Sequence, residues 1–238
     1  MNARSDQLTT DNAIDPVAAT ARLTAALRAA ESARPTPLFN DPFAARLAGA
    51  AGEALLDELD MRDSPIIPVR TRYFDDVVRD AVSSGTRQIV LVAAGMDTRA
   101  YRLGLPGDAT LFELDRPNLL HLKSELLGSA EPSLTRIPIG TDLATDFAGS
   151  LAASGFRADR PTCWLVEGLT QYLTEPDVHR LLDRISQQSA VGSCLAIDFV
   201  GTSLLDSPAM RPMLDRLAER DMAWHYGNEE PGTLLSRP

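Results

Sequence analysis

A glycine and an acidic residue follow two apolar segments of this chain, at a spacing that suits nucleoside binding. Gly95 comes after residues 88–93, and Asp115 lies 20 residues further along, after residues 109–114. A glycine lets the backbone approach a ligand without a Cβ in the way. A carboxylate at this distance along the chain accepts hydrogen bonds from the two hydroxyl groups of a ribose. The pair therefore predicts a nucleoside site, although Asp115 could also be a surface aspartate ahead of a helix begun by Pro117.

The next two apolar segments are also followed by acidic residues. Asp142 and Leu143 come after residues 134–139, and Glu167 comes after residues 162–166. The Asp142 carboxylate would accept a hydrogen bond from the exocyclic amine of an adenine, and Leu143 would pack on the ring. A role for Asp142 as a helix cap is an equal alternative. Glu167 is suited to face a cationic group. An acidic residue at three successive segment ends is more than we expect by chance.

These residues meet only if the apolar segments are neighbouring parallel strands. Strand patterns cover residues 88–93, 109–114, 134–139, 162–166 and 193–200. Helical patterns separate or follow them at residues 117–127, 144–153, 175–190 and about 207–222. Such alternation predicts a doubly wound α/β fold with a mostly parallel sheet and helices on both of its faces. In this architecture ligands bind beyond the carboxyl ends of the strands, where the strand order reverses.

The first third of the chain has helical patterns only. Three Asp-Pro or Ser-Pro pairs, at residues 15–16, 41–42 and 64–65, indicate helix starts with a capping side chain and a first-turn proline. Residues 1–12 are polar and aperiodic, which predicts a disordered tail. We therefore predict an N-terminal helical cap over residues 13–85 and a ligand-binding α/β domain over residues 86–238.

The composition indicates a globular protein of the cytoplasm. Hydrophobic residues make up 44% of the chain, enough for a core, and the net charge of −10 argues against a broad nucleic-acid footprint. No apolar run is long enough to span a bilayer, and the N-terminus lacks the pattern of a signal peptide. Cys163 and Cys194 are expected to be free thiols. No histidine or cysteine cluster has the spacing of metal ligands, so we predict no metal.

Several motifs together resemble the leucine carboxyl methyltransferase superfamily. They lie at residues 31–35, 41–43, 69–76, 88–103, 112–117, 142–143 and 165–173, in the expected order. The stretch Gly-Met-Asp-Thr-Arg at residues 95–99 is the most specific of them. The resemblance spans about residues 20 to 230. It is strongest toward the bacterial branch, which includes polyketide carboxyl and O-methyltransferases of the tetracenomycin type.

The resemblance implies a class I, Rossmann-like methyltransferase fold that binds S-adenosylmethionine. By position, the implied cofactor-binding residues are Arg70, Gly95, Asp115, Asp142, Leu143 and Glu167. Arg70 would pair with the methionine carboxylate of the cofactor, which the planar guanidinium can bind in a bidentate manner. Arg72 competes for this role. Asp115 would hold the ribose, Asp142 and Leu143 the adenine, and Glu167 the amino-acid end.

The resemblance also bears on the end of the chain. Residues 224–235 resemble the family segment that precedes a final antiparallel strand pair, and the sequence stops at Pro238. We therefore expect this strand pair to be missing from the sheet.

Two other functions are considered. The protein could be a non-catalytic relative that binds the cofactor or a metabolite. A nicotinamide-dependent oxidoreductase is disfavoured, because the loop around Gly95 lacks the other glycines of a dinucleotide fingerprint.

The implied reaction moves a methyl group onto an oxygen of a small molecule. A carboxylate acceptor is ionised at neutral pH and needs no general base, whereas a phenolic hydroxyl does. His121 and His179 fall in predicted helices, and only His225 lies near a predicted pocket. The lack of a convincing base favours a carboxylate over a hydroxyl acceptor. We thus predict an S-adenosylmethionine-dependent O-methyltransferase of secondary metabolism, and assign neither a catalytic residue nor an oligomeric state.

Overall fold

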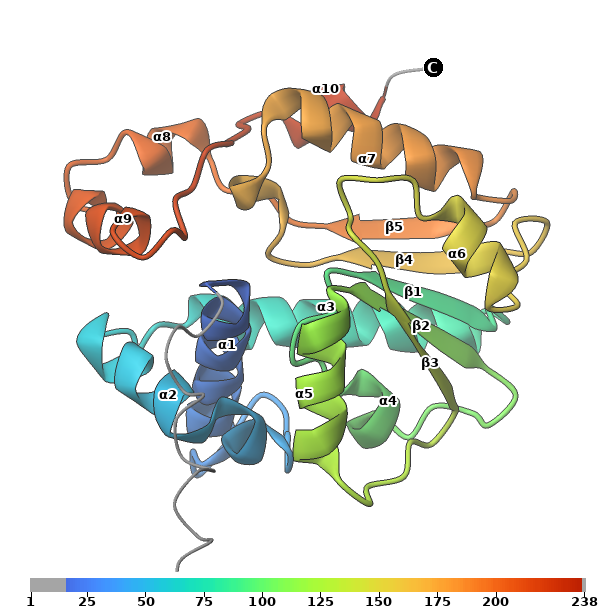
Figure 1. Cartoon of the computed structure of the whole chain (residues 1–238), viewed down its shortest axis with the longest axis horizontal. Coiled ribbons are helices and arrows are strands. Elements are labelled where there is room, and N and C mark those ends of the chain that lie inside the picture. Colours follow the sequence, from blue (N-terminus) through green and yellow to red (C-terminus); the bar gives the residue numbers. More distant parts are fainter. Residues whose placement is uncertain (1–15, 237–238) are drawn as a thin grey trace, which may run out of the picture.

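A computed structural model describes residues 16–236 of the chain and shows one five-stranded sheet flanked by helices (Figure 1). All four strand pairings are parallel, and the strand order is β3-β2-β1-β4-β5. The strands are β1 (Gln88–Val92), β2 (Thr110–Asp115), β3 (Thr135–Gly140), β4 (Thr162–Val166) and β5 (Cys194–Ile197). The predicted doubly wound α/β fold is therefore confirmed, and each predicted strand is present within a few residues of its expected bounds.

The helices alternate with the strands after a helical N-terminal third. They are α1 (Pro16–Ser32), α2 (Ala44–Glu58), α3 (Ile66–Ser83), α4 (Arg99–Arg102), α5 (Pro117–Leu127), α6 (Ala148–Ala153), the 3-10 helix η1 (Thr170–Tyr172), α7 (Glu175–Gln187), α8 (Thr202–Leu205), α9 (Arg211–Ala218) and α10 (Pro231–Leu235). The Thr174 hydroxyl caps the start of α7 by accepting a hydrogen bond from the Asp177 N–H. The cap assigned to Asp15 and the tail at residues 1–12 lie outside the described residues.

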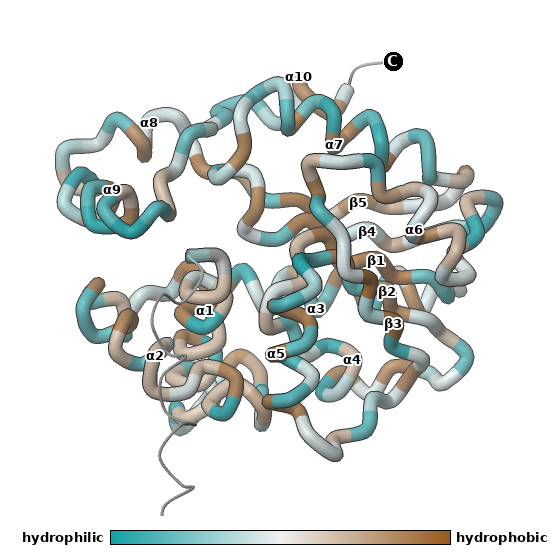
Figure 2. Tube along the Cα trace, in the orientation of Figure 1, coloured by the Kyte–Doolittle hydropathy of each residue, from teal (hydrophilic) through white to brown (hydrophobic). Residues whose placement is uncertain are grey.

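The two faces of the sheet are covered by different helices. On one face, Ile89 and Leu165 of the central strands pack against Phe74 of α3. On the other face, Val90 and Trp164 pack against side chains of α6 and α7. The strands β1 and β4 are buried along their whole length, and the apolar strands lie in the interior of the molecule (Figure 2). Side chains of one strand thus point alternately to two separate helical layers.

The N-terminal helices form a third apolar cluster beside the carboxyl ends of the strands. Leu27 of α1, Leu47 and Leu56 of α2 and Leu119 of α5 are buried together there. Figure 1 shows α1 and α2 side by side, and α1 also contacts α3 while α2 contacts α5. Helix α3 packs directly on the sheet, so the helical N-terminal third shares a hydrophobic core with the strands. The division into a cap at 13–85 and a domain at 86–238 stays a prediction.

Three helices are shorter than the sequence pattern predicts, and one of them, α7, ends at Gln187 and not at residue 190. Residues 144–147 are not helical because the Asp142 and Asp146 carboxylates accept backbone N–H bonds two residues ahead, which closes turns instead. Helix α9 begins at Arg211 and not near Ser207. Pro212 lacks an N–H and is tolerated only in the first turn of a helix, so the start moves to place it there.

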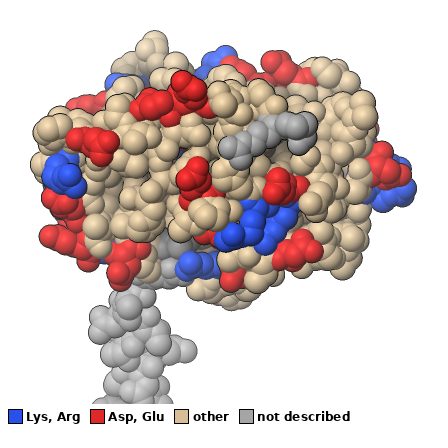
Figure 3. All heavy atoms as spheres, turned by 90° about the horizontal axis from the view of Figure 1, so that it is seen from above, with Lys and Arg blue, Asp and Glu red and all other residues tan. Residues whose placement is uncertain are grey.

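Among the described residues, the sheet contains parallel strand pairs only. Residues 226–236 hold the short helix α10. Arg216 of α9 donates to the Glu58 carbonyl at the end of α2, and Arg220, just after α9, forms an ion pair with the Glu58 carboxylate. Among residues 16–236, every helix is too short or too polar to cross a bilayer. Acidic and basic side chains are interspersed on the face shown in Figure 3.

Candidate functional site

The carboxyl ends of the strands converge at the point where the strand order reverses. The chain leaves β1 toward β2 on one side and later adds β4 on the other side of β1. Loops from the ends of these strands therefore diverge and leave a crevice between them. Gly95 follows β1, Asp115 ends β2, Asp142 follows β3 and Glu167 follows β4. All four residues line one cavity.

The loop after β1 is bonded directly to the end of β2. The Asp115 Oδ2 atom accepts a hydrogen bond from the Gly95 N–H at 2.7 Å, and Oδ1 accepts one from the Arg116 N–H at 2.7 Å. Gly95 has a φ of +48°, a conformation that L side chains rarely adopt. Burial raises the pKa of the Asp115 carboxyl, although these two backbone donors act against the shift. The prediction that Gly95 and Asp115 lie together is thereby met in geometry.

The end of β3 contributes a polar residue and an apolar one. The Asp142 Oδ1 atom accepts a hydrogen bond from the Ala144 N–H at 2.9 Å, so this carboxylate closes a turn. It does not cap α6, which begins only at Ala148. Leu143 is partly buried and packs against the apolar cluster of the α6 and α7 face. Both side chains line the same cavity as Asp115.

The end of β4 carries a cluster of charged side chains. The Arg70 Nε atom of α3 donates to Glu167 Oε1 at 3.1 Å, and its Nη1 atom donates to Asp198 Oδ2 at 3.1 Å. Arg99 contacts the other oxygen of Glu167 at 2.9 Å. Burial opposes ionisation of Glu167, but Arg99 and Arg70 hold the pKa of its carboxyl below the usual range. Glu167 is therefore an ionised carboxylate between two guanidinium groups.

Asp198 also belongs to this cluster, and sequence reasoning missed it. The residue follows β5, and its Oδ1 atom accepts a hydrogen bond from the Gly168 N–H at 2.7 Å. Burial raises the pKa of its carboxyl, while Arg70 acts in the opposite direction. The signal was present, because Asp198 lies inside the apolar segment 193–200 that the sequence assigned to a strand.

The two arginines that competed for the cofactor carboxylate lie in different surroundings. Arg70 lines the cavity, and its side chain is 16% exposed. Arg72 is 49% exposed, pairs with Asp76 on the surface of α3 and is not among the residues that line the cavity. The geometry therefore favours Arg70, as a helix turns successive side chains to different faces.

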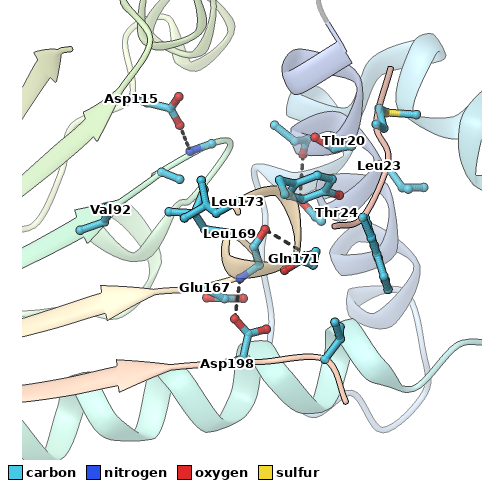
Figure 4. A pocket seen from close by; sticks show the side chains of 18 of the residues that line it. Thr20, Leu23, Thr24, Val92, Asp115, Glu167, Leu169, Gln171, Leu173 and Asp198 are labelled. Atoms are coloured by element: carbon cyan, nitrogen blue, oxygen red, sulfur yellow. Dashed lines mark hydrogen bonds between the residues drawn. The ribbon is translucent and has the colours of Figure 1, made fainter. Parts of the chain in front are cut away.

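One cavity of about 730 Å³ brings these residues together. Its lining includes Arg70, Gly95, Asp115, Asp142, Leu143 and Glu167, all six residues that the sequence resemblance assigned to the cofactor. Figure 4 shows Asp115, Glu167 and Asp198 reaching in from the strand ends, with Thr20 and Thr24 of α1 on the opposite side. The volume lies within the range of small-molecule and cofactor sites in proteins.

A comparison with known protein families shows which family the chain belongs to. The family model of the leucine carboxyl methyltransferases matches residues 21–186, which is more than half of the chain. The chain belongs to this family.

Curated relatives of this methyltransferase agree with the family match. One from Mycolicibacterium gilvum is 40% identical over 226 residues, which cover 87% of this chain and 74% of the relative. Another from Mycolicibacterium vanbaalenii is 42% identical over 213 residues, which cover 80% of this chain and 70% of the relative. Both are assigned as S-adenosyl-L-methionine-dependent methyltransferases. The predictions of the family, of a methyltransferase and of S-adenosylmethionine as its cofactor are confirmed.

Solved structures support the fold. A DUF574 family protein from Streptomyces avermitilis superposes with a TM-score of 0.65 at 18% identity, covering 91% of this chain and 81% of that chain. A protein from Thermobifida fusca assigned as a methyltransferase gives a TM-score of 0.62 at 16% identity, covering 90% and 77%. The class I methyltransferase fold of the present methyltransferase is thus confirmed, whereas the roles of its individual site residues stay predictions.

A buried ion-pair network behind the cavity holds the loop after β1, and sequence reasoning missed it. Arg28 of α1 donates through Nη2 to the Met96 carbonyl at 2.6 Å and through Nε to Asp41 Oδ2 at 2.9 Å. The Thr98 hydroxyl donates to the same Asp41 oxygen at 2.8 Å. Asp41 was expected to cap a helix, but α2 begins only at Ala44.

A second part of the network connects the same loop to α3. The Asp75 carboxylate is fully buried and accepts hydrogen bonds from Arg99 and Arg102 of α4. Arg99 also pairs with Asp97 and with Glu167 of the site. The stretch at residues 95–99 that carried the resemblance is therefore fixed on both sides by buried charges. Such pairs define the geometry of a site more than they add to stability.

Proposed function

We propose that this methyltransferase transfers the methyl group of S-adenosylmethionine to a carboxylate oxygen of a small molecule. The observation that carries the proposal is the convergence of Arg70, Gly95, Asp115, Asp142 and Glu167 on one cavity. The resemblance to polyketide carboxyl and O-methyltransferases further suggests a secondary metabolite as the acceptor.

The residues present fit the adenosyl part of the cofactor. Each oxygen of the Asp115 carboxylate accepts one backbone N–H, and a carboxylate oxygen can accept a further hydrogen bond. Asp115 would therefore accept both ribose hydroxyls while holding Gly95 in place. Asp142 would accept from the adenine amine, and Leu143 would pack against the ring. The arrangement of acceptors around an apolar side chain suits a nucleoside.

The charged cluster fits the amino-acid part of the cofactor. An arginine has five N–H donors, so the ion pairs of Arg70 with Glu167 and Asp198 still allow it to bind a carboxylate. The two acidic side chains would in turn receive the ammonium group. A zwitterion thus finds charges of both signs within one cluster, which favours S-adenosylmethionine over a nucleotide with phosphates.

The role of the protein in the reaction is to position the acceptor relative to the cofactor. S-Adenosylmethionine supplies an activated methyl group together with its own leaving group. The strand-end residues would fix the cofactor, and the cavity walls would hold the acceptor oxygen in line and exclude water. A carboxylate is already ionised at neutral pH, so no proton has to be removed before transfer.

Transfer to a hydroxyl is a second candidate, because one possible base lies in the cavity. His225 lines the cavity, its backbone N–H donates to the Gln171 carbonyl at 2.7 Å, and the residue is exposed to solvent. Its imidazole could take the proton of a phenolic acceptor, whose ordinary pKa near 10 keeps the hydroxyl protonated at neutral pH. The chemical stability of the product distinguishes the two candidates.

The proposal is tested by binding and by methyl transfer. Calorimetry should detect binding of S-adenosylmethionine and of S-adenosylhomocysteine to the protein. Nicotinamide cofactors serve as the control and should give no heat of binding. Radiolabelled methyl groups transferred to carboxylic acids should be released as methanol by mild alkali, because esters hydrolyse and ethers do not. Alkali-stable label that depends on His225, lost in His225→Gln, would replace the carboxylate by the hydroxyl candidate. Binding without transfer to any acceptor would indicate a non-catalytic relative.

A further inference from the structure

The cavity contains an unusual concentration of one residue type. The chain has six methionines, and five of them, Met61, Met96, Met210, Met213 and Met222, line this cavity. They come from widely separated parts of the chain, namely the segment before α3, the loop after β1, and the region of α9. Methionine is flexible and polarisable and fills irregular apolar space, so it is common on surfaces that bind apolar ligands.

The methionines belong to one continuous apolar wall. Met96 and Met222 are buried in the same cluster as Leu23 and Leu27 of α1. Met61 and Met213 are partly exposed and pack against that cluster. The apolar wall, as used below, is defined as ten of the side chains shared by this cluster and the cavity, namely Leu23, Leu27, Leu59, Met61, Ile67, Met96, Met213, Leu217, Met222 and Trp224.

The apolar wall is distinct from the charged strand ends. Asp115, Glu167 and Asp198 reach into the cavity from the carboxyl ends of β2, β4 and β5, whereas Leu23 lies across the cavity on α1 (Figure 4). Apart from Met96, the wall comes from α1, the segment from the end of α2 to the start of α3, and residues 213–224. The cavity therefore has a charged side made by strand ends and a mainly apolar side made by helices, where Thr20 and Thr24 of α1 add hydroxyl groups.

An aromatic pair closes one end of the wall. The rings of Tyr172 and Trp224 are 6.4 Å apart and nearly perpendicular. Burial raises the pKa of the Tyr172 hydroxyl, so it stays protonated at neutral pH. The wall therefore presents methyl, methylene and ring surfaces without an ionised group of its own, and a charged acceptor body would lose its hydration there without compensation.

We propose that the acceptor is a carboxylic acid with an extended apolar body, which packs on the apolar wall while its carboxylate reaches the charged side. This inference rests on the proposed methyl transfer to a carboxylate and adds the substrate class. The flexible methionine side chains adapt to bodies of different shape, so the site accepts a family of apolar acids.

The test measures binding of straight-chain acids from butanoate to decanoate by calorimetry, with S-adenosylhomocysteine present. Affinity should rise about fourfold for each added methylene, the value for full burial of that group. Octanedioate, which carries a second charge at the far end, should bind at least roughly tenfold more weakly than octanoate, because that charge meets the wall. An affinity that does not depend on chain length, or equal binding of the two acids, overturns the proposal.

Variants locate the effect on the wall. Met213→Gln places an amide of similar length among apolar side chains and should weaken octanoate binding about tenfold. Met213→Leu should restore most of the affinity, because it keeps the apolar surface. Val191→Gln is the matched control, since Val191 is fully exposed and outside the cavity. Unchanged octanoate binding in Met213→Gln, with S-adenosylhomocysteine binding intact, refutes the assignment.

The binding assay separates this inference from the proposed function. Chain-length dependence is measured without turnover, so it stands even where no acid is methylated. Methylation of short polar acids, with no gain from added methylenes, would support carboxylate transfer and refute the apolar acceptor. Chain-length dependence together with alkali-stable methylation of long-chain alcohols would refute the carboxylate and keep the wall as the site of the apolar body.

Discussion

Replacement of Asp115 by asparagine is the sharpest test of the cofactor site. Both carboxylate oxygens accept backbone N–H bonds of 2.7 Å, one from Gly95 and one from Arg116. An amide has only one acceptor oxygen, so its NH2 group faces one of the two donors in either orientation. The ribose diol also loses one acceptor oxygen and the negative charge. A hydrogen bond to a charged group contributes about 1.5–3 kcal/mol, so the Kd of S-adenosylmethionine should rise roughly 10- to 150-fold.

Calorimetry with S-adenosylhomocysteine measures this effect, and Asp108→Asn provides the matched control. Asp108 is an exposed carboxylate on the loop before β2, paired only with Arg87 among its described contacts, and its loss should leave affinity unchanged. Thermal denaturation of both variants without ligand shows whether the fold persists. A folded Asp115→Asn protein that binds within threefold of the unchanged protein would refute the role of Asp115 at the ribose.

The same residue predicts a dependence of binding on pH. Burial raises the pKa of the Asp115 carboxyl, so the folded protein binds this proton more tightly than the unfolded chain does. The corresponding contribution to stability is present at low pH and is lost as the pH rises through the folded-state pKa. Cofactor binding is expected to have the opposite dependence, because the ionised form of Asp115 is the one that would accept the ribose hydroxyl groups. Affinity should therefore fall on acidification at a pH above the ordinary pKa of about 3.9, and Asp115→Asn should lack this step.

Three further predictions concern the ion pairs and the core. Arg70→Leu should weaken cofactor binding at least roughly tenfold in calorimetry, because a charge-assisted contact is lost. Arg72→Leu should leave cofactor binding unchanged, and equal effects of the two variants would contradict the assignment of Arg70. Asp75→Asn should lower the free energy of unfolding by about 3–5 kcal/mol in urea denaturation, since the buried guanidinium groups of Arg99 and Arg102 lose a partner. Phe147→Ala should lower it by about 3–5 kcal/mol in the same assay, as this fully buried ring leaves a cavity, and a loss below about 1 kcal/mol would contradict its place in the core.

The fold could be predicted from the sequence because its signals are local. Apolar segments such as residues 88–93 and 162–166 are buried on both sides in a parallel sheet, so they form nearly continuous apolar runs. The residue after each strand then falls at the carboxyl edge by geometry alone. Gly95 and Glu167 could therefore be placed at one site before the strand order was known.

The features that could not be predicted depend on side chains from distant segments. Asp41 resembles a helix cap in the sequence, yet its carboxylate is bound by Arg28 and Thr98, and the latter lies 57 residues away. The Asp142 carboxylate accepts a hydrogen bond from the Ala144 N–H and closes a turn, so the helix predicted from residue 144 begins later. The apolar wall has no sequence motif, because its residues come from segments that become neighbours only in the folded chain.

The separate origin of the two sides of the cavity affects how acceptor choice can vary among related methyltransferases. The charged side is made by strand ends that also complete the sheet, so changes there disturb both the fold and the cofactor. The apolar side depends on the helices around Met61 and Met213, and α9 is joined to α2 through surface contacts of Arg216 and Arg220 with Glu58. Relatives with different methyl acceptors are therefore expected to share residues 95–167 and to diverge at residues 59–67 and 210–224.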